Sequence, residues 1–310
     1  MEITNKYSIV FMGTPEFAVP SLQTILKVSD FQVEAVFTQP DKKVGRKQEL
    51  MTPPVGVLAK ERGIKLYQPT KVMENLTEIQ AIKPDVMVVV AYGEILPEEI
   101  LKIPKYGVIN LHASLLPKYR GASPIQTAIL KGERETGVSV IKLVKEMDAG
   151  DILGQKKIKI GERETSEELF SRLTEEGSMF LVEILRKLVK GKGEFRPQDA
   201  KKATYCPKIT KSDGEIKWKE KTAKEIYDQI RAFTPWPGSF TFIKNKRLKI
   251  LEADYEIEKA FKPGEVVTVS DKEVLIGAKK GALRLLKVQL EGGNPIGIKE
   301  FLKGNLQLFL

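Results

Sequence analysis

Histidine and cysteine are almost absent from this sequence, which contains one of each among 310 residues. A zinc centre built from cysteine and histidine needs three or four such ligands, so the sequence excludes one. A disulfide within the chain needs two cysteines and is excluded for the same reason. Any chemistry that requires an imidazole must use His112, because the chain has no other. Cys206 has no partner cysteine, and we expect it to be inert.

Long apolar runs and the common nucleotide-binding motifs are also missing. The longest clean apolar run, Val86 to Val90, is far shorter than the ~20 residues that cross a bilayer. The first residues lack the basic and apolar regions of a signal peptide, so we expect a cytoplasmic protein without a membrane partner. The turn at 11–17 lacks the G-x-G-x-x-G fingerprint, and no phosphate loop occurs, which argues against NAD and ATP chemistry.

Positive charge exceeds negative charge by 10 at neutral pH, and more than half of this excess falls in residues 206–310. A basic balance favours polyanionic partners such as nucleic acid. The charge alone is equally compatible with a lysine-rich protein that has no such partner.

Apolar strand patterns alternate with helical patterns in the first half of the chain. This alternation predicts an α/β fold with a Rossmann-like open, mainly parallel sheet and helices on both faces. The turn after the first strand suits a helix start, with Thr14 as N-cap and Pro15 as the first helical residue. The expected strands are 7–12, 33–37, 65–67, 86–90, 107–111, 138–144 and 152–160, and the expected helices are 15–28, 53–63, 72–82, 123–131 and 165–190.

A polar stretch with glycine and proline at 191–208 is typical of a linker. Beyond it, a helical pattern at 223–233 precedes short strand patterns at 239–243, 248–253, 265–269, 274–276 and 282–290. Such spacing predicts a small, OB-like antiparallel β-barrel. We therefore expect a first domain at 1–190, a linker at 191–208 and a C-terminal barrel at 209–310.

The segment 107–121 carries the polar residues that best fit a functional site. Asn110 and His112 lie two apart at the end of a predicted strand, so both point to one face. The carboxyl edge of an open parallel sheet faces the ligand crevice. An amide and an imidazole at that edge can supply an oxyanion donor and a proton acceptor. The alternative is a structural histidine that is hydrogen-bonded within the sheet.

A third candidate, Asp148, lies in a glycine-containing loop after a predicted strand. A carboxylate beside the imidazole would orient it and stabilise its positive charge. From this segment alone, an aspartate that stabilises a turn is the simpler interpretation.

Several blocks of the sequence resemble those of the 10-formyltetrahydrofolate-dependent formyltransferases. Asn110-Leu111-His112-Ala113-Ser114-Leu115-Leu116-Pro117, with Asp148 downstream, is similar to that family's signature. Blocks at 11–18, 38–41, 117–126, 147–151 and 231–238 are also similar and occur in the same order over essentially the whole chain. The similarity is closer still to the branch whose acceptor is methionyl initiator tRNA.

This resemblance implies formyl transfer with 10-formyltetrahydrofolate as the donor, without a metal ion or NAD. It implies that Asn110, His112 and Asp148 form the catalytic trio. Two further segments correspond to the family's folate-binding segments, and the residues expected to contact folate are Ser114, Leu115, Leu116, Pro117, Tyr92, Gly93 and Leu96. For the three leucines, ordinary core packing is the alternative.

A basic loop at 41–49 follows the second predicted strand. The simple interpretation is a solvated surface loop. The resemblance implies instead that the loop contacts the acceptor end of the tRNA, through Lys42, Lys43, Arg46 and Lys47. Arg46 matches the family's arginine, whereas the lysines match only in charge.

A second basic patch lies in the predicted barrel and contains Lys244, Lys246, Arg247 and Lys249. Because side chains alternate along a strand, only some of these can share a face, and the sequence does not say which.

Other functions stay open at this stage. A related formyltransferase that acts on a sugar nucleotide would also carry a small C-terminal barrel, whereas one acting on glycinamide ribonucleotide is usually a single smaller domain. A non-catalytic RNA-binding protein with a basic barrel belongs to a different class, and the intact trio argues against it. We expect a monomer that binds methionyl initiator tRNA and the folate donor.

Overall fold

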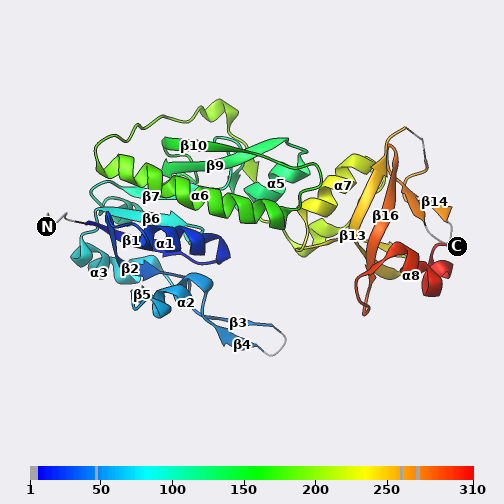
Figure 1. Cartoon of the computed structure of the whole chain (residues 1–310), viewed down its shortest axis with the longest axis horizontal. Coiled ribbons are helices and arrows are strands. Elements are labelled where there is room, and N and C mark those ends of the chain that lie inside the picture. Colours follow the sequence, from blue (N-terminus) through cyan, green and yellow to red (C-terminus); the bar gives the residue numbers. More distant parts are fainter. Residues whose placement is uncertain (1–5, 46–47, 259–260, 270–272) are drawn as a thin grey trace. The chain divides into compact units, whose positions relative to one another are not determined.

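The chain forms two compact units in a computed structural model that describes residues 6–45, 48–258, 261–269 and 273–310 (Figure 1). Each unit combines stretches that are distant in the sequence. Unit 1 consists of Met1–Gly121, Thr136–Ile158 and Phe170–Tyr205, and unit 2 consists of Ala122–Glu135, Lys159–Leu169 and Cys206–Leu310. The linear domain boundaries expected at 190 and 209 stay a prediction.

A seven-stranded sheet forms the centre of unit 1, in the order β10-β9-β7-β6-β1-β2-β5. The strands from β7 to β5 run parallel, whereas β9 is antiparallel to β7. This mainly parallel sheet confirms the predicted Rossmann-like class. Its strands are β1 (Tyr7–Gly13), β2 (Phe31–Phe37), β5 (Lys65–Tyr67), β6 (Val86–Val90), β7 (Val108–His112), β9 (Glu135–Lys142) and β10 (Ile152–Lys159).

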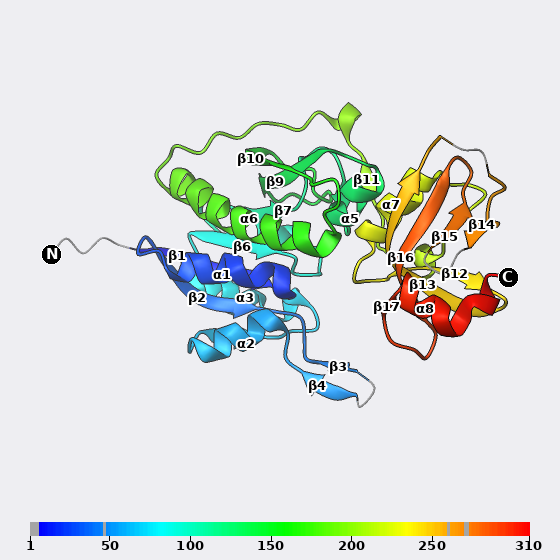
Figure 2. The ribbon, with the colours of Figure 1, turned by 45° about the vertical axis from the view of Figure 1, so that its right-hand side comes forward.

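Helices cover both faces of this sheet, because its central strands are apolar on both sides. On one face, α6 brings Gly177 so close to Leu111 of β7 that an added Cβ atom would lie 3.3 Å from a leucine methyl carbon. On the other face, Ile79 of α3 and Ile100 of α4 join an apolar cluster that contains Met87. The helices on the sheet are α1 (Val19–Leu26), α2 (Pro54–Glu61), α3 (Leu76–Ile82), α4 (Glu98–Leu101) and α6 (Ser166–Val189). Figure 2 labels α1, α2, α3 and α6 of this set.

The turn after β1 differs from the sequence prediction. A short 3-10 helix (Glu16–Ala18) precedes α1, and no side chain caps either helix. The Thr14 hydroxyl donates to the carbonyl oxygen of Tyr92 at 2.7 Å and accepts from the N–H of Gln39 at 3.2 Å. The prediction of Thr14 as N-cap was therefore wrong, because this hydroxyl joins the loops that follow β1, β2 and β6 at the carboxyl edge of the sheet.

The basic segment after β2 forms a two-stranded hairpin rather than an irregular loop. Its strands are β3 (Lys42–Val44) and β4 (Glu49–Met51). Leu50 and Met51 of β4 are 67% and 54% exposed, so the hairpin presents apolar as well as basic side chains to solvent.

Unit 2 contains an antiparallel sheet in the order β12-β13-β16-β15-β14, with β17 beside β16. The sheet curls as a half-barrel around an apolar cluster that includes Ile226 and Ile230 of α7 and Phe301 of α8. This architecture confirms the predicted class of the C-terminal region. Its elements are α5 (Pro124–Leu130), α7 (Ala223–Ala232), β12 (Ser239–Ile243), β13 (Lys246–Glu256), β14 (Val266–Val269), β15 (Val274–Gly277), β16 (Ala282–Leu290), β17 (Ile296–Gly297) and α8 (Ile298–Asn305).

The stretch 191–208, which was expected to be a linker, forms short elements, one of which pairs with another part of the chain. It contains a 3-10 helix (Ala200–Lys202) and the short strand β11 (Tyr205–Cys206), which pairs with β8 (Arg120–Gly121). Within the described ranges, every helix is too short or too polar to span a bilayer.

Candidate active site

Two polar side chains of the proposed site come from the end of β7. Asn110 and His112 alternate with Leu111, and because Leu111 faces α6, both polar residues face the opposite side of the sheet. Asn110 and His112 are each 7% exposed. The amide and the imidazole are therefore held on one strand, largely out of water, at the carboxyl edge where loops from β1, β2 and β6 converge.

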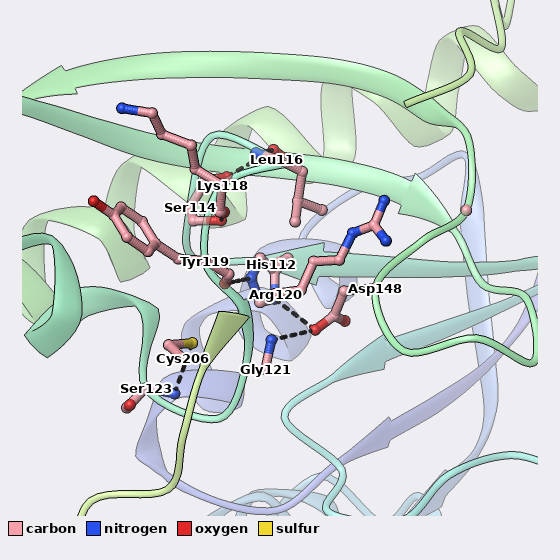
Figure 3. Close-up of polar contacts among 12 residues, drawn as sticks. His112, Ser114, Leu116, Lys118, Tyr119, Arg120, Gly121, Ser123, Asp148 and Cys206 are labelled. Carbon is pink, nitrogen blue, oxygen red and sulfur yellow. Dashed lines mark hydrogen bonds and ion pairs between the residues drawn. The ribbon is translucent and has the colours of Figure 1, made fainter. Parts of the chain in front are cut away.

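The two nitrogen atoms of His112 face different groups (Figure 3). Nε2 lies 2.9 Å from the carbonyl oxygen of Tyr119. A carbonyl oxygen can only accept, so Nε2 carries a hydrogen and donates it. Nδ1 lies 3.7 Å from Oδ2 of Asp148. The proton that this imidazole can gain or lose is therefore the one at Nδ1, beside the carboxylate.

Asp148 is placed by its own backbone and by the loop after β7. Its φ angle is +51°, in the left-handed region that aspartate enters more readily than most residues. The N–H of Gly121 donates to Oδ2 at 2.8 Å, which directs the same oxygen atom toward the imidazole. The structure thus brings the aspartate of the trio, predicted 36 residues downstream, next to the strand that holds the other two.

The loop after β7 is fixed by a buried hydroxyl of the neighbouring strand. Ser139 of β9 donates to the carbonyl of Ser114 at 2.7 Å and accepts from the N–H of Leu116 at 3.0 Å. Gln155 of β10 donates to Ser139 and to the Leu116 carbonyl. The loop conformation is therefore set by hydrogen bonds that strands β9 and β10 supply.

The predicted folate contacts in this loop differ in exposure. Ser114 is fully buried and its hydroxyl donates to the carbonyl of Lys118, while Leu116 is 3% exposed in a small cluster with Ile141. Leu115 and Pro117 are half-buried. Their contacts with folate stay a prediction, and the side chains of Ser114 and Leu116 serve the loop itself.

The segment after β6 offers mainly backbone groups. Tyr92 is 1% exposed and Leu96 is 5% exposed, and both belong to the apolar cluster beneath the sheet. Burial raises the pKa of the Tyr92 phenol. Gly93 is exposed with a φ angle of +93°, and Ile95 is 70% exposed. Folate contacts of Tyr92, Gly93 and Leu96 stay a prediction, and the exposed Ile95 is an apolar surface that the sequence analysis missed.

The sequence analysis also missed residues that hold the loops of the trio. Arg120, 6% exposed, donates through Nη2 to the side-chain oxygen of Gln198 at 2.7 Å. The amide nitrogen of Gln198 donates to the main-chain carbonyls of Asp148 and Gly150. Gln198 lies in the expected linker, and no local pattern there signals a role in a site.

The basic hairpin lies at the same edge of the sheet, after β2. At its base, the Asp41 carboxylate accepts from Gln68 at 2.7 Å. Lys42 and Lys43 are exposed. Arg46 and Lys47 lie outside the described residues. Among the residues that the structure describes, no group of three histidine, cysteine, aspartate or glutamate side chains could hold a metal ion.

Comparison with known proteins identifies the class. A family model described as "Formyl transferase" matches residues 6–185, and one described as "Formyl transferase, C-terminal domain" matches residues 208–306. The chain therefore belongs to the formyl transferase family. A relative from Caldanaerobacter subterraneus subsp. tengcongensis, named methionyl-tRNA formyltransferase, is 45% identical over 300 residues, which cover 96% of each chain.

Solved structures share the fold at lower identity. An N-formyltransferase from Helicobacter canadensis, in complex with folinic acid and dTDP-3-aminofucose, has a TM-score of 0.68 at 24% identity and covers 90% of this chain and 98% of its own. HypX from Aquifex aeolicus, in complex with tetrahydrofolic acid, has a TM-score of 0.63 at 20% identity over 96% of this chain and 47% of its own. These similarities support the fold described above.

Proposed function

We propose that this chain transfers the formyl group of 10-formyltetrahydrofolate to the α-amino group of methionyl initiator tRNA, for the initiation of translation. The observation that carries the proposal is the 45% identity to a methionyl-tRNA formyltransferase over 96% of both chains. The convergence of an amide, an imidazole and a carboxylate on β7 and its neighbouring loop supports it.

Asn110 supplies the hydrogen-bond donor for the oxyanion that develops when the amine attacks the formyl carbon. A donor that is already fixed costs little reorganisation when charge develops on the carbonyl oxygen, and removing one such donor typically lowers kcat by about 10²–10³-fold. Asn110 suits this role because its strand is bonded on both sides, to β6 and β9.

His112 moves the proton that the reaction transfers from the amine to the folate. As the new C–N bond forms, the amine loses one proton, and as the old bond breaks, N10 of the folate gains one. His112 takes and returns this proton at Nδ1, directly or through water, since Nε2 is already hydrogen-bonded to Tyr119. Asp148 stabilises the positive charge that the imidazole acquires.

The donor fits the edge of the sheet on which the trio lies. Gly93, which has only backbone groups to offer, is exposed, and Ile95 offers an exposed apolar side chain. A flat heterocycle with polar edges needs this combination of backbone groups and apolar surface. We infer that the loop of Ser114, Leu115, Leu116 and Pro117 forms the second wall of this folate site, through its main chain and the half-buried side chains of Leu115 and Pro117.

The acceptor stem binds to the exposed hairpin of β3 and β4. Lys42 and Lys43 lie opposite Met51 and Leu50, so cationic and apolar side chains are presented together. Cationic side chains neutralise phosphates, and the apolar pair suits contact with the unstacked end of a helix. We propose that Arg46 and Lys47, which lie outside the described residues, add to this positive charge.

One face of the β12–β13 pair in unit 2 is a second surface suited to tRNA. Arg247 is opposite Phe242 and Lys249 is opposite Phe240, so these four side chains share one face. The other face packs into the core through Leu248. Phe242 is 57% exposed, and the Arg247 guanidinium lies 3.6 Å from the centre of the Phe240 ring.

Changing Arg247 and Lys249 together to alanine should raise the KM for tRNA and leave kcat unchanged, because contacts to phosphate contribute affinity without touching the reacting atoms. The dependence of log KM on log salt should flatten by about 2, one unit for each lost phosphate contact. Steady-state kinetics from 50 to 200 mM salt measures both.

The matched control is the double variant Lys244→Ala and Lys246→Ala on the same hairpin. Lys244 already donates a hydrogen bond to the Gln307 carbonyl, and Lys246 lies on the other face. Equal effects of the two pairs would contradict this assignment.

The proposed function is tested by offering the purified chain 10-formyltetrahydrofolate with four acceptors: methionyl initiator tRNA, the same tRNA without methionine, methionyl elongator tRNA and a dTDP-amino sugar. We expect rapid formylation of the first acceptor only. Formylation of the sugar nucleotide alone would contradict the proposal and show a sugar-nucleotide formyltransferase instead. Tight tRNA binding without any formylation would favour a non-catalytic RNA-binding protein. We further propose that the protein works as a monomer in the cytoplasm, where charged initiator tRNA is used.

A further inference from the structure

The stretch that follows α6 contacts both loops that carry the proposed trio. Thr204 accepts the N–H of Arg120 on its carbonyl at 2.8 Å and the N–H of Tyr119 on its hydroxyl at 2.9 Å. Tyr119 is the residue whose carbonyl holds the His112 imidazole. A segment with the composition of a linker therefore supports the loop after β7.

Gln198 of the same stretch supports the other loop. Its amide nitrogen donates to the carbonyl of Asp148 at 2.7 Å and to the carbonyl of Gly150 at 2.7 Å. Its amide oxygen accepts from Arg120, through Nε at 3.2 Å and Nη2 at 2.7 Å. Both amide hydrogens and the amide oxygen of this side chain form hydrogen bonds. These bonds determine its rotamer and which end of the amide is oxygen and which is nitrogen.

We propose that Gln198, oriented by Arg120, is a positioning residue that sets the carboxylate of Asp148 against His112 for formyl transfer. This inference rests on the proposed function and adds a residue to its machinery. Gln198 does not touch the reacting atoms, and it acts through the backbone of Asp148.

The backbone of Asp148 needs such support because its φ angle of +51° is disfavoured for residues other than glycine. The two carbonyls that Gln198 binds lie on either side of Ala149, so the donor holds the whole turn. At Gly150 an added Cβ atom would lie 1.7 Å from the Lys142 carbonyl oxygen, so the turn is also packed tightly against β9. A misplacement of about 1 Å in a catalytic group can cost about 10²-fold in rate.

Two substitutions separate the donor role of Gln198 from its contact with Arg120. Gln198→Glu keeps the size and the acceptor for Arg120, but it places an oxygen where the two carbonyls need a donor. Gln198→Ala removes both contacts. If the proposal is right, both variants lower kcat by about 10–100-fold and leave the KM values for tRNA and donor within about twofold. If Gln198→Glu turns over at the wild-type rate, the proposal is wrong.

Combination with Asp148→Asn tests whether Gln198 acts through Asp148. Because residues that act as a unit are non-additive, Gln198→Glu should cost less than about twofold in the Asp148→Asn background. Single-turnover formylation, followed over hours, measures the residual rates. A further loss in the double variant equal to the loss in wild type would show a merely structural role and overturn the proposal.

Gln229 of α7 is a matched control. It is fully buried, its amide nitrogen donates to the carbonyl of Gly214 at 3.2 Å, and its oxygen accepts from Lys221 at 2.6 Å. Gln229→Glu should lower the melting temperature, and its effect on kcat should multiply with that of Asp148→Asn.

The Asp148→Asn variant separates failure of this inference from failure of the proposed function. Wild-type activity of Asp148→Asn would refute the proposed trio itself. An impaired Asp148→Asn beside a fully active Gln198→Glu would refute only the role of Gln198.

Discussion

Replacement of His112 by asparagine should lower kcat for formyl transfer by about 10²–10⁴-fold, the usual contribution of a positioned acid–base group. Asparagine is polar and smaller than histidine, so it fits the buried position, but it has no nitrogen that gains and loses a proton near neutral pH. No other imidazole can take over, because the chain contains one histidine. Rapid-quench measurement of formyl-methionyl-tRNA in a single turnover tests this.

Binding measurements provide the control for this variant. His112 contacts Tyr119 and faces Asp148, both within the protein, so equilibrium affinities for tRNA and for the folate donor should stay within about twofold. The single imidazole resonance in the proton spectrum should disappear, which verifies the substitution directly. A variant that forms product at the wild-type rate would remove His112 from the mechanism, and with it the role assigned to Asp148.

Simultaneous replacement of Lys42, Lys43, Arg46 and Lys47 by alanine should raise the KM for tRNA and leave the KM for the folate donor unchanged. Each phosphate contact contributes about 0.9 to the slope of log affinity against log salt, so four lost contacts should flatten the slope by about 3 to 4. Between 50 and 200 mM salt, the wild type should therefore lose about 100-fold more affinity than the variant. Fluorescence titration of labelled initiator tRNA across this range measures the difference.

A charge-matched control distinguishes the hairpin from a general effect of net charge. Lys83, Lys105, Lys190 and Lys192 are exposed in unit 1 and lie outside the hairpin. Changing these four to alanine removes the same charge, and the salt slope should stay within about one unit of wild type. Equal slopes for both quadruple variants would favour the simple interpretation of the hairpin as a solvated surface segment.

The strands of the parallel sheet and the shared face of Asn110 and His112 could be predicted from the sequence, because both follow from local periodicity. The run Val86–Val90 is fully buried, as its five apolar residues predict. Two-residue spacing on β7 placed the amide and imidazole together without knowledge of the rest of the chain. The resemblance to formyltransferases then supplied the function and favoured a catalytic role for Asp148 over the turn that its own segment suggests.

Contacts between distant loops could not be predicted in this way. Thr14 has the features of an N-cap, yet its hydroxyl donates to the carbonyl oxygen of Tyr92, 78 residues away. Gln198 lies in a stretch without apolar periodicity, and its partners are 48 and 50 residues upstream. The sequence analysis also missed the short helices α4 and α8. The four residues of α4 make little more than one helical turn, which is too short to show a helical period. Periodicity reports the face of an element, whereas these contacts depend on how loops meet after folding.

The composition of unit 2 from separate stretches limits how the gene can be divided. Arg231 of α7 donates to the carbonyls of Gly161 and Glu164, and Ser123, next to α5, donates to the carbonyl of Pro207. A fragment that begins after residue 208 would lack Gly161 and Glu164 and leave the 6%-exposed guanidinium of Arg231 short of acceptors. A chimera that takes the C-terminal half-barrel from a relative must therefore also take residues 122–135 and 159–169 from that relative. The three stretches of unit 2 have to be exchanged together.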